Sequence, residues 1–172
     1  GNIGKPMLDE LDTSTKDTVF VIELSRHQLV DIRYSPHIAV LLHIVPEHLD
    51  YYPDFASYKK AKENIFRFQK QGDHLVRSEK TDETFTPNRN GTGFTTNLLG
   101  NQENIAVAVR VARLMQVPEE EIKRQLSSFT PIPHRLEFVG EIRGIRFYND
   151  SLATIPEATI HALNALGPEV ST

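Results

Sequence analysis

Residues 38–45, IAVLLHIV, decide the expected fold class because they form a short, almost continuously apolar run. A second run, TVFVIE at residues 18–23, has the same character. Short apolar runs rich in β-branched residues are typical of strands covered on both faces, as in parallel sheets. Residues 55–68 follow with apolar side chains spaced three and four apart, which predicts a helix with one buried stripe. Strand followed by crossover helix predicts an α/β protein with a three-layer, mostly parallel sheet.

The second half of the chain predicts further helices and a domain boundary. A helix is expected over residues 101–115, and another opens at Pro118 with Ile122, Leu126 and Phe129 facing inward. The two prolines of TPIPH, residues 130–134, end that helix and stiffen an extended connection. We therefore expect one domain over residues 1–131 and the start of a second over 132–172. The second contains an expected strand, GIRFYND at 144–150, and an expected helix, PEATIHALNAL at 156–166, with Ile160, Leu163 and Leu166 on one face.

Composition excludes several classes of protein. With 172 residues and 39% hydrophobic content, the chain is long enough to bury a sizeable core. Basic and acidic residues are interleaved and the net charge is -4, which argues against a nucleic-acid partner. No apolar run approaches the roughly 18 residues of a membrane helix, and no export signal opens the chain. The absence of cysteine excludes disulfides and thiolate chemistry and fits the cytoplasm.

Three residues of the first half are candidates for metal chemistry. Glu23 ends the first apolar run and His48 follows the second, and ligands of parallel sheets gather outside the carboxyl ends of strands. The two side chains could hold a divalent cation there, or they could be a solvent-exposed acid and a loop histidine. Lys62 falls on the apolar side of the 55–68 helix. A lysine there must extend its amine to solvent, pair with an acid, or be chemically altered.

The sequence contains few signals of a nucleotide-binding site. The opening GNIGKP lacks the GxxxxGK[ST] pattern of a phosphate loop, and this pattern occurs nowhere in the chain. If ATP is used, a segment not present here must hold its triphosphate. Arg135 in HRLE and Asp150 in YNDS are a candidate pair, either as a structural salt bridge or as nucleotide contacts.

Six blocks of sequence, in order, resemble the Mur ligases. They are GNIGKP, ELSRHQL, HIVPEHLDYYPDFASYKKAKENIF, LLGNQENIAVAV, IPHRLEFVGEIRGIRFYNDS and ATIPEATIHAL. The combination of HRLE with NDS-x-AT-x-PEAT looks most like the branch that adds D-glutamate to UDP-N-acetylmuramoyl-L-alanine. The resemblance implies a Mur ligase central domain followed by the start of a Rossmann-like C-terminal domain. It also implies ATP- and Mg²⁺-dependent amide-bond formation through an acyl phosphate.

The resemblance further implies roles for individual residues. Glu23 and His48 match magnesium-associated positions, and Lys62 matches a lysine that becomes carbamylated and helps to hold the second metal; His48 and Lys62 are the expected catalytic residues. The remaining matches are contacts to the UDP-sugar substrate (Asn2, Ser25, Gln28), positions near adenine (Asn101, Asn104), nucleotide contacts from the third domain (Arg135, Asp150) and a position near the D-glutamate site (Thr154).

Departures from the family pattern keep other readings open. Leu152 stands where NDSKAT normally has lysine, Gly100 stands where the helix block begins with histidine, and the segment between Lys62 and Gly100 is shorter than expected. The six matching blocks include no N-terminal UDP-binding domain, no phosphate loop and only the start of the third domain of the family. We therefore expect the chain alone to be inactive. Alternatives are a noncatalytic binding module with the same fold and a small metal-dependent hydrolase using Glu23, His48 and His134.

Overall fold

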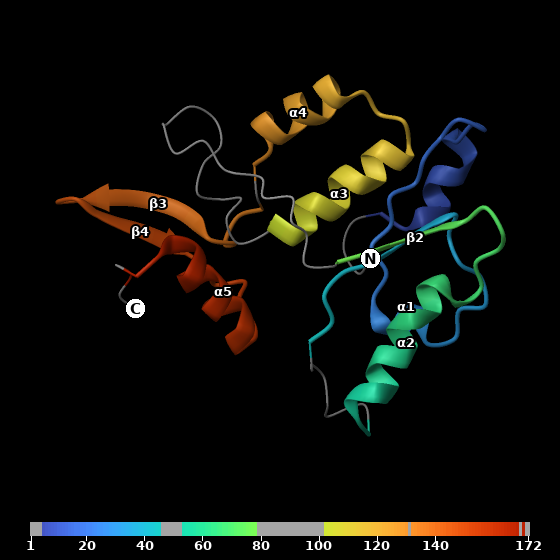
Figure 1. Cartoon of the computed structure of the whole chain (residues 1–172), viewed down its shortest axis with the longest axis horizontal. Coiled ribbons are helices and arrows are strands. Elements are labelled where there is room, and N and C mark those ends of the chain that lie inside the picture. Colours follow the sequence, from blue (N-terminus) through green and yellow to red (C-terminus); the bar gives the residue numbers. More distant parts are fainter. Residues whose placement is uncertain (1–4, 46–52, 79–101, 131, 169, 171–172) are drawn as a thin grey trace. The chain divides into compact units, whose positions relative to one another are not determined.

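The computed structural model describes residues 5–45, 53–78, 102–130, 132–168 and 170 (Figure 1). Contacts between residues divide the chain into two compact units, Gly1–Val76 and Arg77–Thr172. The predicted boundary after residue 131 stays a prediction, because residue 131 itself lies outside the described residues. The two units are therefore described one after the other.

The first unit is an α/β arrangement around a small parallel sheet. Its elements are η1 (Met7–Thr13), α1 (Arg26–Leu29), β1 (Ile38–Leu41), α2 (Phe55–Arg67) and β2 (His74–Arg77). β1 and β2 pair as a two-stranded parallel sheet, with α2 as the crossover between them. The predicted helix over 55–68 is confirmed to within one residue. The predicted strand over 38–45 is confirmed for its first half only.

Helix α2 begins and packs as its sequence dictates. The Asp54 carboxylate accepts a hydrogen bond from the Ser57 backbone amide at 2.7 Å, which caps the first turn. That bond is also the main reason why the pKa of Asp54 lies below its ordinary value. Tyr58 and Ala61 are buried on the inner face, and Phe55 and Ile44 pack against them. Apolar burial along one stripe thus fixes the face that α2 turns inward.

The prediction of a strand over residues 18–23 is wrong. The structure describes this segment without helix or strand, and it pairs with no strand among the described residues. Its apolar side chains are exposed, and Val21 reaches 97%. A β-strand is stabilised by hydrogen bonds and side-chain contacts across to its neighbour, so an apolar run alone is not sufficient to form one.

Helices α3 (Gln102–Leu114) and α4 (Glu119–Ser128) form a helical hairpin in the second unit, and Figure 1 shows them joined by a short connection. Both were predicted. Ile105 and Val109 of α3 bury against Ile122 of α4, with Ala112, Val117 and Leu126 packed around them. Across the connection, Arg113 Nε donates to the Glu119 carboxylate at 2.6 Å. The inward position predicted for Phe129 is wrong, because its side chain is 54% exposed.

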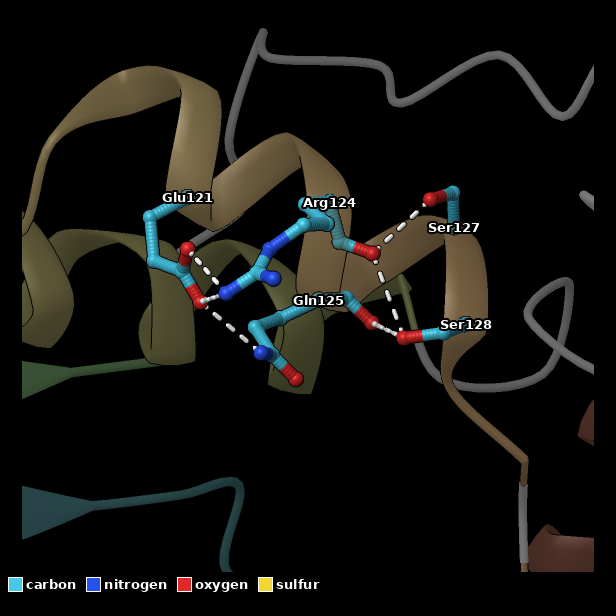
Figure 2. Close-up of polar contacts among 5 residues, drawn as sticks. All are labelled: Glu121, Arg124, Gln125, Ser127 and Ser128. Carbon is cyan, nitrogen blue, oxygen red and sulfur yellow. Dashed lines mark hydrogen bonds and ion pairs between the residues drawn. The ribbon is translucent and has the colours of Figure 1, made fainter.

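The outer face and the end of α4 are organised by polar contacts (Figure 2). Arg124 and Gln125 both donate to the Glu121 carboxylate, and Arg124 lowers the pKa of that carboxyl. At the end of the helix, the Ser127 and Ser128 hydroxyls donate to the Arg124 carbonyl oxygen. The Ser128 hydroxyl also lies 3.2 Å from the Gln125 carbonyl oxygen, one of the last four of α4, which lack partners within the helix.

The last elements are a β-hairpin and a helix. β3 (Glu137–Ile142) pairs antiparallel with β4 (Ile145–Asn149), with a bulge between Phe138 and Gly140, and α5 (Pro156–Leu166) follows. β4 and α5 confirm the predictions, although Ile160 of α5 is 54% exposed. β3 was not predicted. None of the described helices combines the length and apolar character that a membrane span requires.

Candidate functional site

The predicted substrate residues Ser25 and Gln28 lie together on the first turn of α1. Ser25 is the N-cap of this helix, and the Gln28 side-chain oxygen accepts a hydrogen bond from the Ser25 backbone amide at 2.9 Å. This is the reciprocal half of a capping box, in which the third helical residue reaches back to the cap. The bond holds the Gln28 side chain beside Ser25. The structure therefore brings these two residues together.

Glu23 lies two residues before Ser25, at the end of the extended segment that leads into α1. Its side chain is exposed, so its carboxylate oxygens can reach a ligand in solvent. The second predicted metal residue, His48, and the predicted substrate residue Asn2 lie outside the described residues. The pairing of Glu23 with His48 therefore stays a prediction.

Lys62 is half-buried on α2, and its amine lies over an aromatic ring. The Nζ atom is 5.0 Å from the centroid of Tyr58, a residue only 2% exposed. A cation over the face of an aromatic ring is stabilised by the ring quadrupole. The structure thus shows how an unmodified Lys62 is accommodated. A carbamylated Lys62 would lose this cation–π contact and gain oxygen atoms of the kind that Mg²⁺ binds.

Asn64 is a functional candidate that the sequence reasoning missed. It is the one polar residue found buried in the described part of the chain, and its Nδ2 donates to the Leu29 and Val30 carbonyl oxygens. The sequence carried a signal for it. Asn64 follows Tyr58 and Ala61 at intervals of three, so it falls on the buried stripe of α2, where a polar residue requires a partner.

The predicted nucleotide residues Arg135 and Asp150 belong to one clasp between the HRLE turn and the end of β4. Asp150 Oδ1 accepts a hydrogen bond from the Leu136 backbone amide at 2.8 Å. The flanking residues His134 and Leu136 have φ of 67° and 47°, a left-handed conformation that costs energy for residues other than glycine. Arg135 is exposed between them. The clasp therefore holds a strained turn that presents the Arg135 side chain to solvent.

The expectation of a structural salt bridge between Arg135 and Asp150 is wrong. Among the described residues no ion pair joins them, and the Asp150 carboxylate binds the backbone amide instead. The Leu152 amide donates to the His134 carbonyl oxygen at 3.1 Å, and Asn149 Nδ2 lies 2.7 Å from His134 Nδ1. These contacts close the clasp from the other side.

The remaining predicted positions lie near the starts of helices. Asn104 is exposed in the first turn of α3, and Thr154 is exposed just before α5. Asn101, the other predicted adenine contact, and Gly100 lie outside the described residues. Leu152, which stands where the family pattern has lysine, is 40% exposed, so a lysine there could reach solvent.

The described residues do not by themselves assemble a metal site. Over residues 5–45, 53–78, 102–130, 132–168 and 170, no three histidine or acidic side chains gather as metal ligands require. The hydrolase reading based on Glu23, His48 and His134 thus gains no support, because the His134 imidazole is engaged by Asn149. The Glu23 carboxylate and a carbamylated Lys62 would both offer oxygen atoms of the kind that Mg²⁺ binds. The chemistry of these two groups is the support for a magnesium site in the described part of the chain.

Comparison with known proteins decides the family. The model of the Mur ligase middle domain matches residues 2–137. The chain belongs to the Mur ligase family. This confirms the resemblance found in the six sequence blocks, and with it the α/β fold class of a Mur ligase central domain.

Individual relatives of this Mur ligase chain share one name, UDP-N-acetylmuramoylalanine--D-glutamate ligase. The chain is 36% identical to that of Desulfovibrio desulfuricans, 35% to that of Fervidobacterium nodosum and 31% to that of Clostridium kluyveri. These matches cover 96%, 95% and 96% of this chain but only 41%, 42% and 43% of the relatives. The chain thus spans about two fifths of the length of the curated relatives it matches.

The alignments also show that this Mur ligase chain is internally shorter than some relatives. The match to the Clostridium kluyveri ligase runs over 199 positions and includes 96% of the 172 residues, which is about 165 residues. About 34 aligned positions therefore have no residue of this chain. That total is compatible with the expected shortening between Lys62 and Gly100, whose location stays a prediction.

Proposed function

We propose that this chain is the central part of a ligase that joins D-glutamate to UDP-N-acetylmuramoyl-L-alanine in peptidoglycan synthesis, in the cytoplasm. The observation that carries the proposal is the match to D-glutamate ligases over 96% of the chain at up to 36% identity. The site geometry supports it, because Ser25 and Gln28 lie together on α1 and Arg135 and Asp150 share one clasp.

The proposed reaction has two steps. The carboxylate of the alanyl residue attacks the γ-phosphorus of ATP, and ADP leaves, which gives an acyl phosphate. The amine of D-glutamate then attacks the acyl carbon, phosphate leaves, and the amine loses a proton as the amide forms. Bound Mg²⁺ would neutralise charge on the phosphoryl oxygens.

The residues of this chain would divide these tasks between them. Ser25 and Gln28, with Asn2, would orient the UDP-sugar, and Thr154 would contribute near D-glutamate. The exposed Arg135 would place a guanidinium, with its fixed donors, against phosphate oxygens. Asp150, Asn101 and Asn104 complete the proposed nucleotide contacts. Glu23, His48 and carbamylated Lys62 would offer the oxygen and nitrogen ligands of the metal, with His48 and Lys62 as the proposed catalytic residues.

A chimera tests the proposal. The matched segment of the Desulfovibrio desulfuricans ligase is replaced by this chain, and phosphate release is measured with ATP, Mg²⁺ and UDP-N-acetylmuramoyl-L-alanine. The proposal expects release that requires D-glutamate and that falls at least 100-fold in Lys62→Ala, the scale of losing an electrostatic group from a phosphoryl-transfer site. Release that persists without D-glutamate would count against it. The chain alone is expected to show no turnover, and robust turnover would contradict that part.

The second candidate is a noncatalytic binding module with the Mur ligase fold, and Leu152 is the observation that favours it. This residue removes a cation expected to steer anionic groups. Because Leu152 is 40% exposed, Leu152→Lys can be introduced without burying a charge. If the chain is part of a catalytic ligase, Leu152→Lys should raise phosphate release in the chimera. An inert chimera that stays inert with Leu152→Lys, yet binds the UDP-sugar, supports the module instead.

A further inference from the structure

Asn64 joins the helix that carries Lys62 to the helix that carries the proposed substrate residues. Its Nδ2 donates to the carbonyl oxygens of Leu29 at 3.0 Å and Val30 at 3.2 Å, both at the end of α1. The last carbonyls of a helix have no partners within it, so the Asn64 amide satisfies part of this deficit. Lys62 lies two residues earlier on α2.

A second side chain holds the same loop from its other end. Ser35 Oγ accepts a hydrogen bond from the Phe68 amide at 3.0 Å and lies 3.3 Å from the Asn64 carbonyl oxygen, to which it donates. The loop that follows α1 is thus attached to α2 at two points. Because α1 is a single turn of four residues, a shift of its end moves the whole turn.

The polar atoms of Asn64 are only partly satisfied at this position. Asn64 is 9% exposed, and its Oδ1 has no hydrogen-bond partner among the described residues. A buried acceptor without a partner loses its hydration and gains nothing in return. An apolar side chain of the same shape would remove this loss, but it would leave the Leu29 and Val30 carbonyl oxygens without their side-chain donor. The distinctive contribution of the Asn64 amide is therefore its pair of bonds to the end of α1.

We propose that Asn64 is a positioning residue, which sets α1, with Ser25 and Gln28, at a fixed place relative to Lys62. The inference rests on the proposed function for the meaning of these three residues. The tether itself rests only on the bonds from Asn64 to Leu29 and Val30. The two parts can therefore be tested separately.

Gln69 provides a matched control within the same unit. Its Nε2 also donates to two backbone carbonyl oxygens, those of Pro36 at 3.2 Å and His74 at 2.7 Å. It follows the end of α2, where it holds the residues next to the starts of β1 and β2, and none of its bonds reaches α1. Loss of the Gln69 amide should thus loosen the loop beside the sheet and leave α1 in place.

The experiment compares the chain with Asn64→Leu, Asn64→Ala and Gln69→Leu. Hydrogen exchange is measured at the backbone amides of Gln28, Leu29 and Val30, and urea unfolding gives the stability of each variant. Titration of the chimera carrying each variant with UDP-N-acetylmuramoyl-L-alanine, followed by calorimetry, gives the affinity of the substrate. We expect Asn64→Leu to change the urea midpoint little, because the lost donor and the removed unpaired acceptor oppose each other, to speed exchange in α1 at least tenfold, and to weaken binding at least fivefold. Gln69→Leu should change neither α1 exchange nor binding.

The other possible results each contradict one claim: the tether, the positioning role or the proposed function. Unchanged exchange in α1 of a folded Asn64→Leu chain would overturn the tether, and so would equal acceleration in Gln69→Leu. If Asn64→Leu does not fold, the same comparison is made with Asn64→Ala below its unfolding transition. Faster exchange with unchanged substrate affinity overturns the positioning role. Absence of binding by the chimera with the unmodified chain counts against the proposed function, while the exchange rates still decide the tether.

Discussion

Replacing Ile122 by alanine should strongly destabilise the hairpin of α3 and α4. Ile122 is 6% exposed and contacts the cluster formed with Ile105 and Val109. The substitution removes three carbons, which at about 0.8 kcal/mol per buried carbon gives a transfer loss of about 2.4 kcal/mol. The cavity left behind adds to this loss, and the range for such substitutions is about 2–5 kcal/mol. Since the cluster joins only two helices, which can partly close the space, we expect about 3 kcal/mol.

Ile160→Ala is the matched control, because it removes the same carbons from a helix where the side chain is 54% exposed. It should cost less than about 1 kcal/mol, the scale of surface substitutions. The assay is hydrogen exchange at the amides of Met115, Val117 and Ile122, whose carbonyl partners lie within or next to the hairpin. A loss below about 1 kcal/mol for Ile122→Ala, or equal losses in both variants, would refute the assignment of the core.

Three further predictions concern single polar or turn residues. The pKa of Asp73 lies below its ordinary value of 3.8, chiefly through the Lys70 amide and then His37, so its stabilisation is present above pH 3.8 and is lost as pH falls below it; Asp73→Asn should flatten the dependence of urea stability on pH between about 5 and 2.5. Arg143 and Gly144 have φ of 52° and 80° between β3 and β4, as a type I′ turn requires. Arg143→Asn should therefore raise the melting temperature, and Gly144→Ala should lower the free energy of unfolding by about 1–2 kcal/mol. An unchanged melting temperature in both variants would contradict the turn assignment. Glu119→Gln should remove the charge from the contact with Arg113 and lower the melting temperature more in low salt than in 1 M NaCl. A salt-independent effect would mean that charge is not involved.

The helices could be predicted from the sequence because their signals are local. In α2, the Asp54 cap and the spacing of Tyr58 and Ala61 lie within a few residues of one another, and they determine both the start and the buried face. The same holds for α4, which begins directly after Pro118. A period of 3.6 residues is read within a single segment, so no knowledge of a partner is needed.

The strands were harder to predict because each depends on a partner distant in sequence or weakly marked. The run at 18–23 is as apolar as β1, yet among the described residues only β1 has a neighbouring strand, which residues 74–77 provide. β3 was missed because apolar and polar side chains do not alternate along it. Val139 and Glu141, two residues apart, differ in polarity, and the bulge between Phe138 and Gly140 breaks the period. What determines β3 is the Arg143–Gly144 turn, which pairs it with β4.

The candidate site shows the same division between local and distant information. Sequence placed Ser25, Gln28, Lys62 and Arg135 by resemblance, but it did not show what holds them. Asn64 and Asp150 do so with their side chains, the first by donating to α1 carbonyls and the second by accepting from the Leu136 amide. Such bonds join residues 35 and 14 positions apart, and composition and periodicity do not reveal which polar residues make them.

The Asn64 tether and the Asp150 clasp differ in backbone strain, and this difference predicts which ligand each would affect in the proposed ligase. The Asn64 tether lies within the first unit and joins unstrained helices, so its loss should release α1 without releasing stored energy. The clasp at Asp150 lies in the second unit and holds His134 and Leu136 in a left-handed conformation, so its loss would let the turn relax and withdraw Arg135. Substrate affinity should therefore depend on Asn64, and nucleotide affinity on the strained turn. If phosphoryl transfer needs both sites, a change in the tether weakens substrate binding and a change in the clasp weakens nucleotide binding. Both changes would then lower the rate of the overall reaction.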